Sequence, residues 1–186
     1  MKWKVLSPGL SAVAFLYFAM MPTHLHARPA AGQPAVIHNA TLSVESQKDG
    51  SYALHSAAVH EPVLESDVDV ETANGVLRSS VYPQHLSSIM PFEDELGAGQ
   101  QLTVTNAGLP NTADLICEFR LYANRPWGDI RVQVRNTTGK PMEIHAIHVI
   151  KSVDGSGPRL NGPDADDRIL SDSFSEDTPQ LKIMDL

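Results

Sequence analysis

Several groups of carboxylates in the chain could in principle bind a metal. Four aspartates follow one another closely after Val153 and offer the hard oxygen ligands that Ca²⁺ prefers: Asp154, Asp164, Asp166 and Asp167. The run that begins at Asp164 lacks the glycine at loop position six and the glutamate at position twelve of the helix-loop-helix calcium signature. We therefore expect a solvated acidic loop here, and the sequence predicts no metal site and no cofactor.

Two further pairs could support acid–base or metal chemistry. His145 and His148 are three residues apart, and in a strand an odd separation places side chains on opposite faces, so a shared metal would be geometrically awkward. Glu176 and Asp177 could act as acid and base on a glycosidic bond. Neighbouring carboxylates in a polar loop are usually just solvated, and we expect this pair to be so.

Nucleophilic catalysis has no clear sequence signature. No Gly-x-Ser-x-Gly motif occurs, and Cys117 is the single cysteine. Cys117 lies on the apolar side of an alternating run rather than at a helix start, which predicts a buried thiol. The sequence thus assigns no catalytic residue.

The stretch from Leu115 to Val153 provides the clearest structural pattern. Its apolar residues recur at every second position between turn signals, which predicts strands with one packed face and one wet face. The predicted inward faces are Leu115, Cys117, Phe119 and Leu121 in the first strand, Ile130, Val132 and Val134 in the second, and Met142, Ile144 and Ala146 in the third.

Two hairpins are predicted before that stretch. An alternating run from Val36 to Val44 is followed by Asp49-Gly50 and then by Tyr52 and Leu54. The second hairpin turns at Asn74-Gly75, a dipeptide that readily adopts the positive φ of a tight hairpin turn. By contrast, residues 83–99 lack a clean period and are acidic near their end, so we expect a loop there, followed by a short strand around Leu102.

No sustained helical period occurs after Arg28, and about eight short strands with turns between them predict an all-β fold. We expect an antiparallel β-sandwich over residues 36–153. Residues 154–186 are expected to form an acidic loop and a last strand near Leu181 that leads toward a missing C-terminal domain.

The first 27 residues have the order of a secretory signal peptide: Lys2 and Lys4, an apolar core, and a small polar end at Ala27. The continuous core from Leu10 to Met21 is shorter than a membrane span needs, which favours secretion or a periplasmic location over a stable membrane anchor. An uncleaved signal anchor is the alternative. Residues 28–35 are expected to be a flexible leader.

The charge balance argues against nucleic-acid partners. The full chain has 14 basic and 22 acidic residues and a net charge of −8; removal of Lys2 and Lys4 with the signal peptide would leave 12 basic residues and a net charge of −10. Such a surface repels phosphates.

Two longer segments resemble the amino-terminal region of secreted bacterial alpha-galactosidases of the melibiase type. They run from Trp127 to Pro141 and from Asp167 to Asp177; Asp49-Gly50-Ser51-Tyr52 and Val81-Tyr82-Pro83 fit more weakly. The resemblance implies a supersandwich-like β-domain that packs on a catalytic barrel. It also implies that the parent enzyme is a retaining glycoside hydrolase acting on terminal alpha-galactosides. The family's catalytic aspartates belong to the barrel, so the resemblance assigns no catalytic residue to this chain.

The sequence thus leaves two functions open. The first is the non-catalytic front domain of an exported alpha-galactosidase-like glycoside hydrolase, which meets its carbohydrate substrate through the parent enzyme. The second is an independent secreted β-sandwich that binds glycans or proteins. The second function needs an exposed aromatic platform, for which the candidates are Trp127, Tyr52, Tyr82 and Tyr122.

Overall fold

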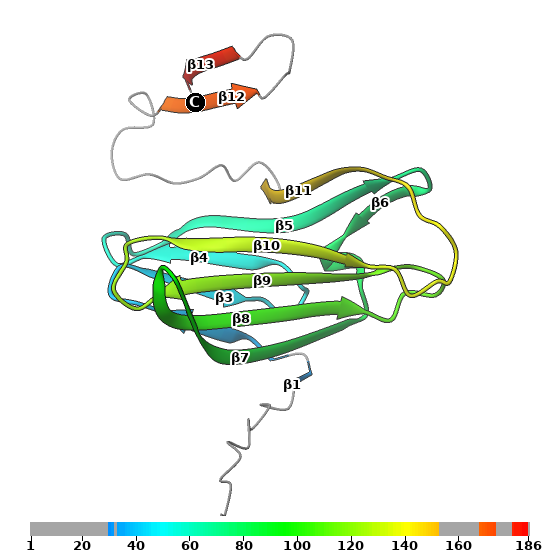
Figure 1. The fold of residues 1–186 in the computed structure, drawn as a ribbon, viewed down its shortest axis with the longest axis horizontal. Helices are drawn as coiled ribbons and strands as arrows, with labels where there is room; N and C mark the ends of the chain where they lie inside the picture. Colours follow the sequence, from blue (N-terminus) through cyan, green and yellow to red (C-terminus); the bar gives the residue numbers. More distant parts are fainter. Residues whose placement is uncertain (1–29, 32, 153–167, 174–179, 186) are drawn as a thin grey trace, which may run out of the picture.

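The computed structural model describes residues 30–31, 33–152, 168–173 and 180–185. Two antiparallel sheets face one another in this part of the chain (Figure 1), which confirms the predicted all-β antiparallel β-sandwich. Sheet A has the strand order β1 (Ala30–Ala31), β7 (Gln84–Asp94), β8 (Gly97–Ala107), β9 (Asp114–Tyr122) and β10 (Gly128–Arg135). Sheet B has the order β11 (Ile144–Ser152), β5 (Pro62–Thr72), β4 (Tyr52–Ser56), β3 (Leu42–Ser46) and β2 (Ala35–His38).

Four smaller elements complete the described part of the chain. Strand β6 (Gly75–Arg78) pairs with β5, and the short 3-10 helix η1 (Ser79–Val81) follows it. Strands β12 (Arg168–Ser173) and β13 (Gln180–Asp185) pair with each other as a separate two-stranded sheet. No helix in the described part of the chain has the length and apolar character needed to cross a bilayer.

Both predicted hairpin turns are present. Gly50, between β3 and β4, has φ +86°, and Gly75, at the turn between β5 and β6, has φ +122°. The prediction of one continuous strand from Val36 to Val44 was wrong, because the chain turns at Asn39 and divides into β2 and β3. The Asn39 side-chain oxygen accepts hydrogen bonds from the backbone N–H groups of Thr41 and Leu42, and this local turn replaces the ladder.

The expected loop at residues 83–99 was also wrong. Strands β7 and β8 form a hairpin with eleven residues in each strand, paired from Gln84 with Ala107 to Asp94 with Gly97. The inward face of β7 carries the polar Ser87 and Glu93 beside Ile89, whereas its outward face carries the apolar residues Leu86, Met90 and Phe92, and this distribution hid the alternation. Pro91 is tolerated because β7 meets only the two-residue strand β1 on its other side, so most of that edge carries no ladder in the described structure.

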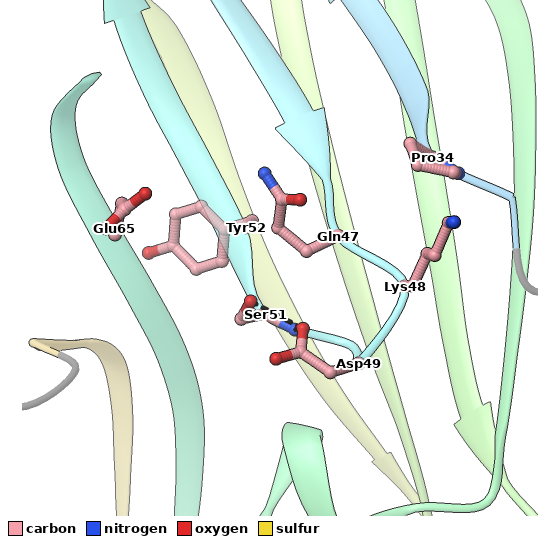
Figure 2. A pocket seen from close by; sticks show the side chains of 7 residues that line it. All are labelled: Pro34, Gln47, Lys48, Asp49, Ser51, Tyr52 and Glu65. Carbon is pink, nitrogen blue, oxygen red and sulfur yellow. Dashed lines mark hydrogen bonds between the residues drawn. The ribbon is translucent and has the colours of Figure 1, made fainter. Parts of the chain in front are cut away.

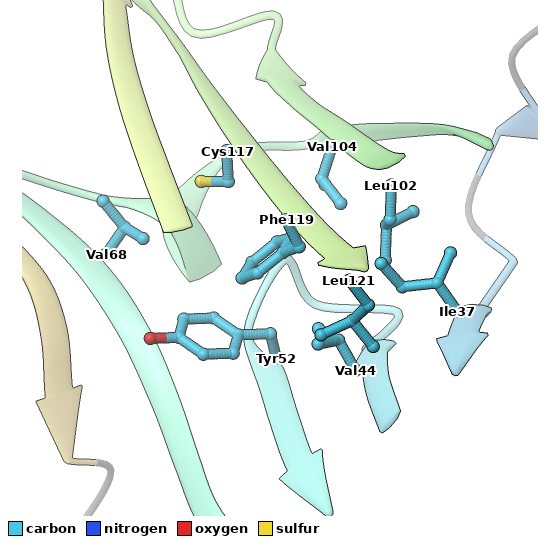
Figure 3. Close-up of a cluster of buried hydrophobic side chains, with 9 residues drawn as sticks. All are labelled: Ile37, Val44, Tyr52, Val68, Leu102, Val104, Cys117, Phe119 and Leu121. Carbon is cyan, nitrogen blue, oxygen red and sulfur yellow. The ribbon is translucent and has the colours of Figure 1, made fainter. Parts of the chain in front are cut away.

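The core lies between the two sheets (Figure 3). Leu115, Cys117, Phe119 and Leu121 are all buried, which confirms the predicted inward face of β9. Phe119 packs on Tyr52 of the opposite sheet, with ring centroids 4.8 Å apart, and so joins the two layers. The largest fully buried side chains of this cluster include Tyr52, Phe119, Ile37 and Leu102.

Some predictions concern residues that the structure does not describe. These are the signal peptide of residues 1–27, the four aspartates between 154 and 167, and the pair Glu176 and Asp177. Within the expected flexible leader, Ala30 and Ala31 pair with Ser87 and Leu86 of β7. The expected last strand near Leu181 corresponds to β13.

Candidate functional site

Three aromatic side chains meet at one end of the outer face of sheet A. Phe92 comes from β7, Tyr122 from the end of β9, and Trp127 from the loop that leads into β10. The Tyr122 ring lies between the other two, with its centroid 5.0 Å from that of Phe92 and 4.8 Å from that of Trp127. Tyr122 is 1% exposed, whereas Trp127 is 38% exposed. This aromatic cluster therefore has a buried centre and an accessible indole at its rim.

Two glycines allow the aromatic cluster to form. A Cβ on Gly99 of β8 would collide with the carbonyl oxygen of Leu121 and would come within 2.9 Å of the Phe92 ring. A Cβ on Gly128 would collide with the carbonyl oxygen of Arg120. Glycine at position 99 leaves room for the Phe92 ring to lie over β8. Glycine at position 128 lets the start of β10, just after Trp127, approach the backbone of β9 closely.

Two carboxylates converge on the hydroxyl of Tyr122. Its oxygen lies 3.0 Å from Asp94 Oδ2 and 3.2 Å from Asp129 Oδ2. Burial and the hydrogen bonds to these two carboxylates raise the pKa of Tyr122 to about 12. Because the hydroxyl carries a single proton, it can donate to only one of the two carboxylates at a time.

The two carboxylates differ in how far they are engaged. Asp94 Oδ1 also accepts the backbone N–H of Leu96, and Arg120 lies 3.8 Å from Asp94 Oδ2. Although desolvation acts in the opposite direction, these backbone and tyrosine hydrogen bonds hold the pKa of Asp94 below its ordinary value. The Asp129 carboxylate has the Tyr122 hydroxyl as its one hydrogen-bond partner among the described residues, so it keeps acceptor capacity for a ligand.

Arg120 lies beside the aromatic cluster and contacts Gln101 and Phe92. Its Nε donates to Gln101 Oε1 at 2.8 Å, and its guanidinium lies over the Phe92 ring, 5.2 Å from the centroid. The contact combines a cation–π interaction with a fixed guanidinium orientation. Arg120 is thereby held in place before any ligand arrives.

The loop that carries Trp127 is fixed from the opposite sheet. The side-chain nitrogen of Asn39 donates to the carbonyl oxygens of Tyr122 and Arg125, each at 2.9 Å. Arg125 in turn donates to the carbonyl oxygen of Leu96 at the tip of the β7–β8 hairpin, at 3.4 Å. Figure 1 shows this tip at the same end of the sandwich as the start of β10. The Asn39 side chain thus uses both its nitrogen and its oxygen for hydrogen bonds inside the fold.

The four aromatic residues that the sequence offered as a binding platform differ in solvent exposure. Tyr52, Tyr82 and Tyr122 are at most 3% exposed, and burial raises the pKa of Tyr52 and of Tyr82 to about 12. Trp127 remains the accessible member of that set. Phe92, Asp94 and Asp129 were not predicted as site residues, because nothing in the local pattern shows that strands β7, β9 and β10 bring them together.

In the described structure, His145 and His148 of β11 do not share a partner. His145 approaches Glu143 at 3.7 Å, whereas His148 approaches Glu71 at 3.9 Å, so the two imidazoles have different partners. The described residues contain no group of three or more metal-ligating side chains.

Cys117 is buried, as predicted, and burial raises the pKa of its thiol to about 12. Asn106 donates to its sulfur at 3.8 Å and lies 2.7 Å from His85 Nδ1. This cysteine–asparagine–histidine series therefore has an un-ionised, enclosed thiol, which is a poor nucleophile.

A second group of carboxylates lies on the outer face of sheet B. Asp67 and Asp69 of β5 are 6% and 3% exposed. Arg78 Nε lies 3.1 Å from Asp69 Oδ1, and Ser80 Oγ donates to Asp67 Oδ2 at 2.9 Å. Ser79 Oγ donates to Asp67 Oδ1 at 3.4 Å. Burial raises the pKa of Asp67 above its ordinary value despite these partners. Covered and paired in this way, the two carboxylates hold β6 and η1 on β5.

A depression near the β3–β4 turn is a further possible site (Figure 2). It is lined by Pro34, Gln47, Lys48, Asp49, Ser51, Tyr52 and Glu65. Asp49 accepts hydrogen bonds from both the backbone N–H and the hydroxyl of Ser51, which stabilise the turn. The Tyr52 hydroxyl donates to the carbonyl oxygen of Val149 at 2.9 Å. The Asp49 carboxylate and the Tyr52 hydroxyl in this depression therefore already have hydrogen-bond partners within the fold.

Comparisons with known proteins leave this chain without a match: no family model matches it, and neither a curated protein nor a solved structure is significantly similar. The aromatic cluster and its neighbours are therefore the features that indicate a function. A half-exposed indole beside a carboxylate with spare acceptor capacity can bind a ligand that is apolar on one face and carries hydroxyl groups at its edge.

Proposed function

We propose that this chain is a non-catalytic saccharide-binding β-sandwich whose binding face is centred on Trp127. The observation that carries the proposal is the accessible Trp127 ring, held beside Asp129 on a rigid sheet face. Pyranose rings present C–H groups on one face and hydroxyls at the edge. An aromatic ring packs against the C–H face, and charged acceptors and donors form strong hydrogen bonds with the hydroxyls.

The rigidity of the site supports this function. Tyr122 is packed between Phe92 and Trp127, and Asn39 holds the backbone of the loop from the other sheet. A site that is ordered before binding loses less conformational entropy when the ligand arrives. This saving matters for a saccharide, whose affinity depends on a few hydrogen bonds and one stacking contact.

Affinity electrophoresis with soluble neutral polysaccharides (xylan, mannan, glucan and galactan) tests the proposal. At least one polysaccharide should retard the chain, and Trp127→Ala should weaken that binding at least about tenfold, because it removes the aromatic residue at the centre of the binding face. Ile150→Ala is the matched control, because Ile150 is a 54% exposed apolar side chain on sheet B. Absence of retardation by the whole panel would reject the proposal.

A second candidate function follows from the alpha-galactosidase resemblance. The two-sheet antiparallel sandwich is the architecture that the resemblance implies for the region in front of the catalytic barrel. Under this proposal the same binding face would lie on a longer glycoside hydrolase that acts on terminal alpha-galactosides. The nucleotide sequence downstream of codon 186 tests it: an open frame with alternating strand and helix patterns is expected, and an immediate stop codon would contradict it.

A further inference from the structure

Strand β10 extends the binding face beyond Trp127. Asp129, Arg131 and Gln133 occupy alternate positions of this strand, so their side chains share one face of the sheet. The register places them opposite Arg120, Glu118 and Ile116 of β9. Arg120 and Ile116 lie on the outward side of β9, because the intervening residues Cys117 and Phe119 are buried. The three β10 side chains therefore face outward as well.

The polar groups on this row are accessible. Arg131 and Gln133 are exposed, and neither side chain has a hydrogen bond or ion pair with another described residue. Glu118 lies directly across from Arg131 but does not approach it within ion-pair distance. Further along, Arg135 is paired with Asp114 at 3.3 Å, which ends the series of available groups. The row thus begins at the Trp127 ring and ends at Gln133.

The length of the row exceeds one sugar ring. Trp127 and Gln133 are six residues apart, which corresponds to roughly 20 Å of extended strand, and the polar side chains recur about every 7 Å. A single ring stacked on Trp127 could reach Asp129 but not Gln133. A linear chain of several sugars could lie along β10 and meet an acceptor, a donor and an amide in turn.

The charges on the row favour an uncharged polymer. Asp129 and Arg131 have opposite signs, Gln133 is neutral, and the β9 neighbours Arg120 and Glu118 also balance. The net charge of the chain, −8, adds a repulsion against polyanions. We infer that the ligand is a linear, uncharged oligosaccharide of about four residues that runs along β10, rather than a single terminal sugar. This inference rests on the saccharide-binding function proposed above and specifies its ligand.

The test uses oligomers of one to six residues from whichever panel polysaccharide binds the chain, with titration calorimetry as the readout. Affinity should rise by about tenfold or more from the dimer to the tetramer and then level off, as each added contact contributes until the row is filled. The double variant Arg131→Ala/Gln133→Ala should bring the tetramer to the affinity of the dimer, while the dimer stays within about twofold of wild type.

The double variant Gln47→Ala/Lys48→Ala in the β3–β4 turn is the matched control and should leave the whole series unchanged. Trp127→Ala tests the proposed binding function itself, because it should weaken the binding of every oligomer, whatever its length. A monomer that binds as tightly as the tetramer would overturn the inference and leave the binding function standing. So would an equal loss for dimer and tetramer in the Arg131→Ala/Gln133→Ala variant. If no oligomer or polysaccharide binds, both proposals fail.

Discussion

On the outer face of sheet B, Asp67 and Asp69 lie buried beneath Arg78, Ser79 and Ser80, whereas on the outer face of sheet A the Trp127 ring and the side chains of Arg131 and Gln133 remain accessible. Both faces combine carboxylates, arginines and hydroxyls. On sheet B each carboxylate already has a guanidinium or hydroxyl partner, so the group stabilises the fold. On sheet A part of the hydrogen-bonding capacity is unused.

This difference shows that residue type alone does not identify a site. A pair of aspartates two residues apart on one strand is a more conspicuous sequence feature than Trp127 followed by Asp129. Burial and complete pairing make Asp67 and Asp69 structural. Partial exposure and an unshared acceptor make the Trp127 face suited to binding.

The largest expected effect contrasts the arginines of the two faces. Arg78→Ala should lower the free energy of unfolding by about 2–3 kcal/mol, because it leaves the buried Asp69 carboxylate without its charged partner; the value is below that for a fully buried pair because Arg78 is itself 48% exposed. Arg131→Ala should change it by less than about 0.5 kcal/mol. Urea denaturation monitored by fluorescence measures both. Equal destabilisation by the two variants would show that the faces do not differ as described.

A smaller effect is expected from the glycine that admits the aromatic cluster. Gly99→Ala should destabilise the chain by about 1–2 kcal/mol, since the new methyl group collides with the Leu121 carbonyl and presses on Phe92. The same variant should weaken saccharide binding, because Phe92 supports Tyr122 and, through it, Trp127. Gly139→Ala is a useful comparison: a Cβ there meets nothing, although φ is +70°, so a stability loss without a binding loss is expected. If Gly99→Ala bound saccharide as tightly as wild type, Gly99 would not be needed to hold the binding face in place.

The smallest expected effect is an opposite pH dependence of the two faces. Burial raises the pKa of Asp67, so the native state binds a proton more tightly than the unfolded state, and the contribution of Asp67 to stability falls as the pH rises through the interval above 3.8. The pKa of Asp94 is lowered, desolvation notwithstanding, by its hydrogen bonds from Leu96 and Tyr122. Its contribution is therefore present above pH 3.8 and is lost as the pH falls through its native pKa.

Unfolding midpoints of wild type, Asp67→Asn and Asp94→Asn between about pH 2.5 and 7 would reveal the two slopes. The difference between wild type and Asp67→Asn should become less favourable to wild type as the pH rises. The difference between wild type and Asp94→Asn should shrink as the pH falls. Slopes of the same sign would contradict the predicted difference between the buried Asp67 and the hydrogen-bonded Asp94.

Several features of the fold follow from local sequence. Asp49-Gly50 and Asn74-Gly75 produce hairpin turns because their backbone conformations cost little at glycine, and the alternation from Leu115 to Leu121 corresponds to a buried face. The β7–β8 hairpin escaped prediction because its turn lacks such a dipeptide and because β7 has polar residues on its inward face and apolar residues on its outward face. Its turn is stabilised instead by Asp94, which accepts the Leu96 N–H.

The sequence by itself determined the all-β class, two of the hairpin turns and the burial of Cys117, because each of these depends on the alternation of neighbouring side chains or on the preferences of one dipeptide. Only the tertiary structure decided that Phe92, Tyr122 and Trp127 form one cluster and that Asn39 holds their loop from the opposite sheet. These contacts join residues from different strands and from both sheets. They depend on strand order and register, which the pairing of whole strands establishes and no local pattern specifies.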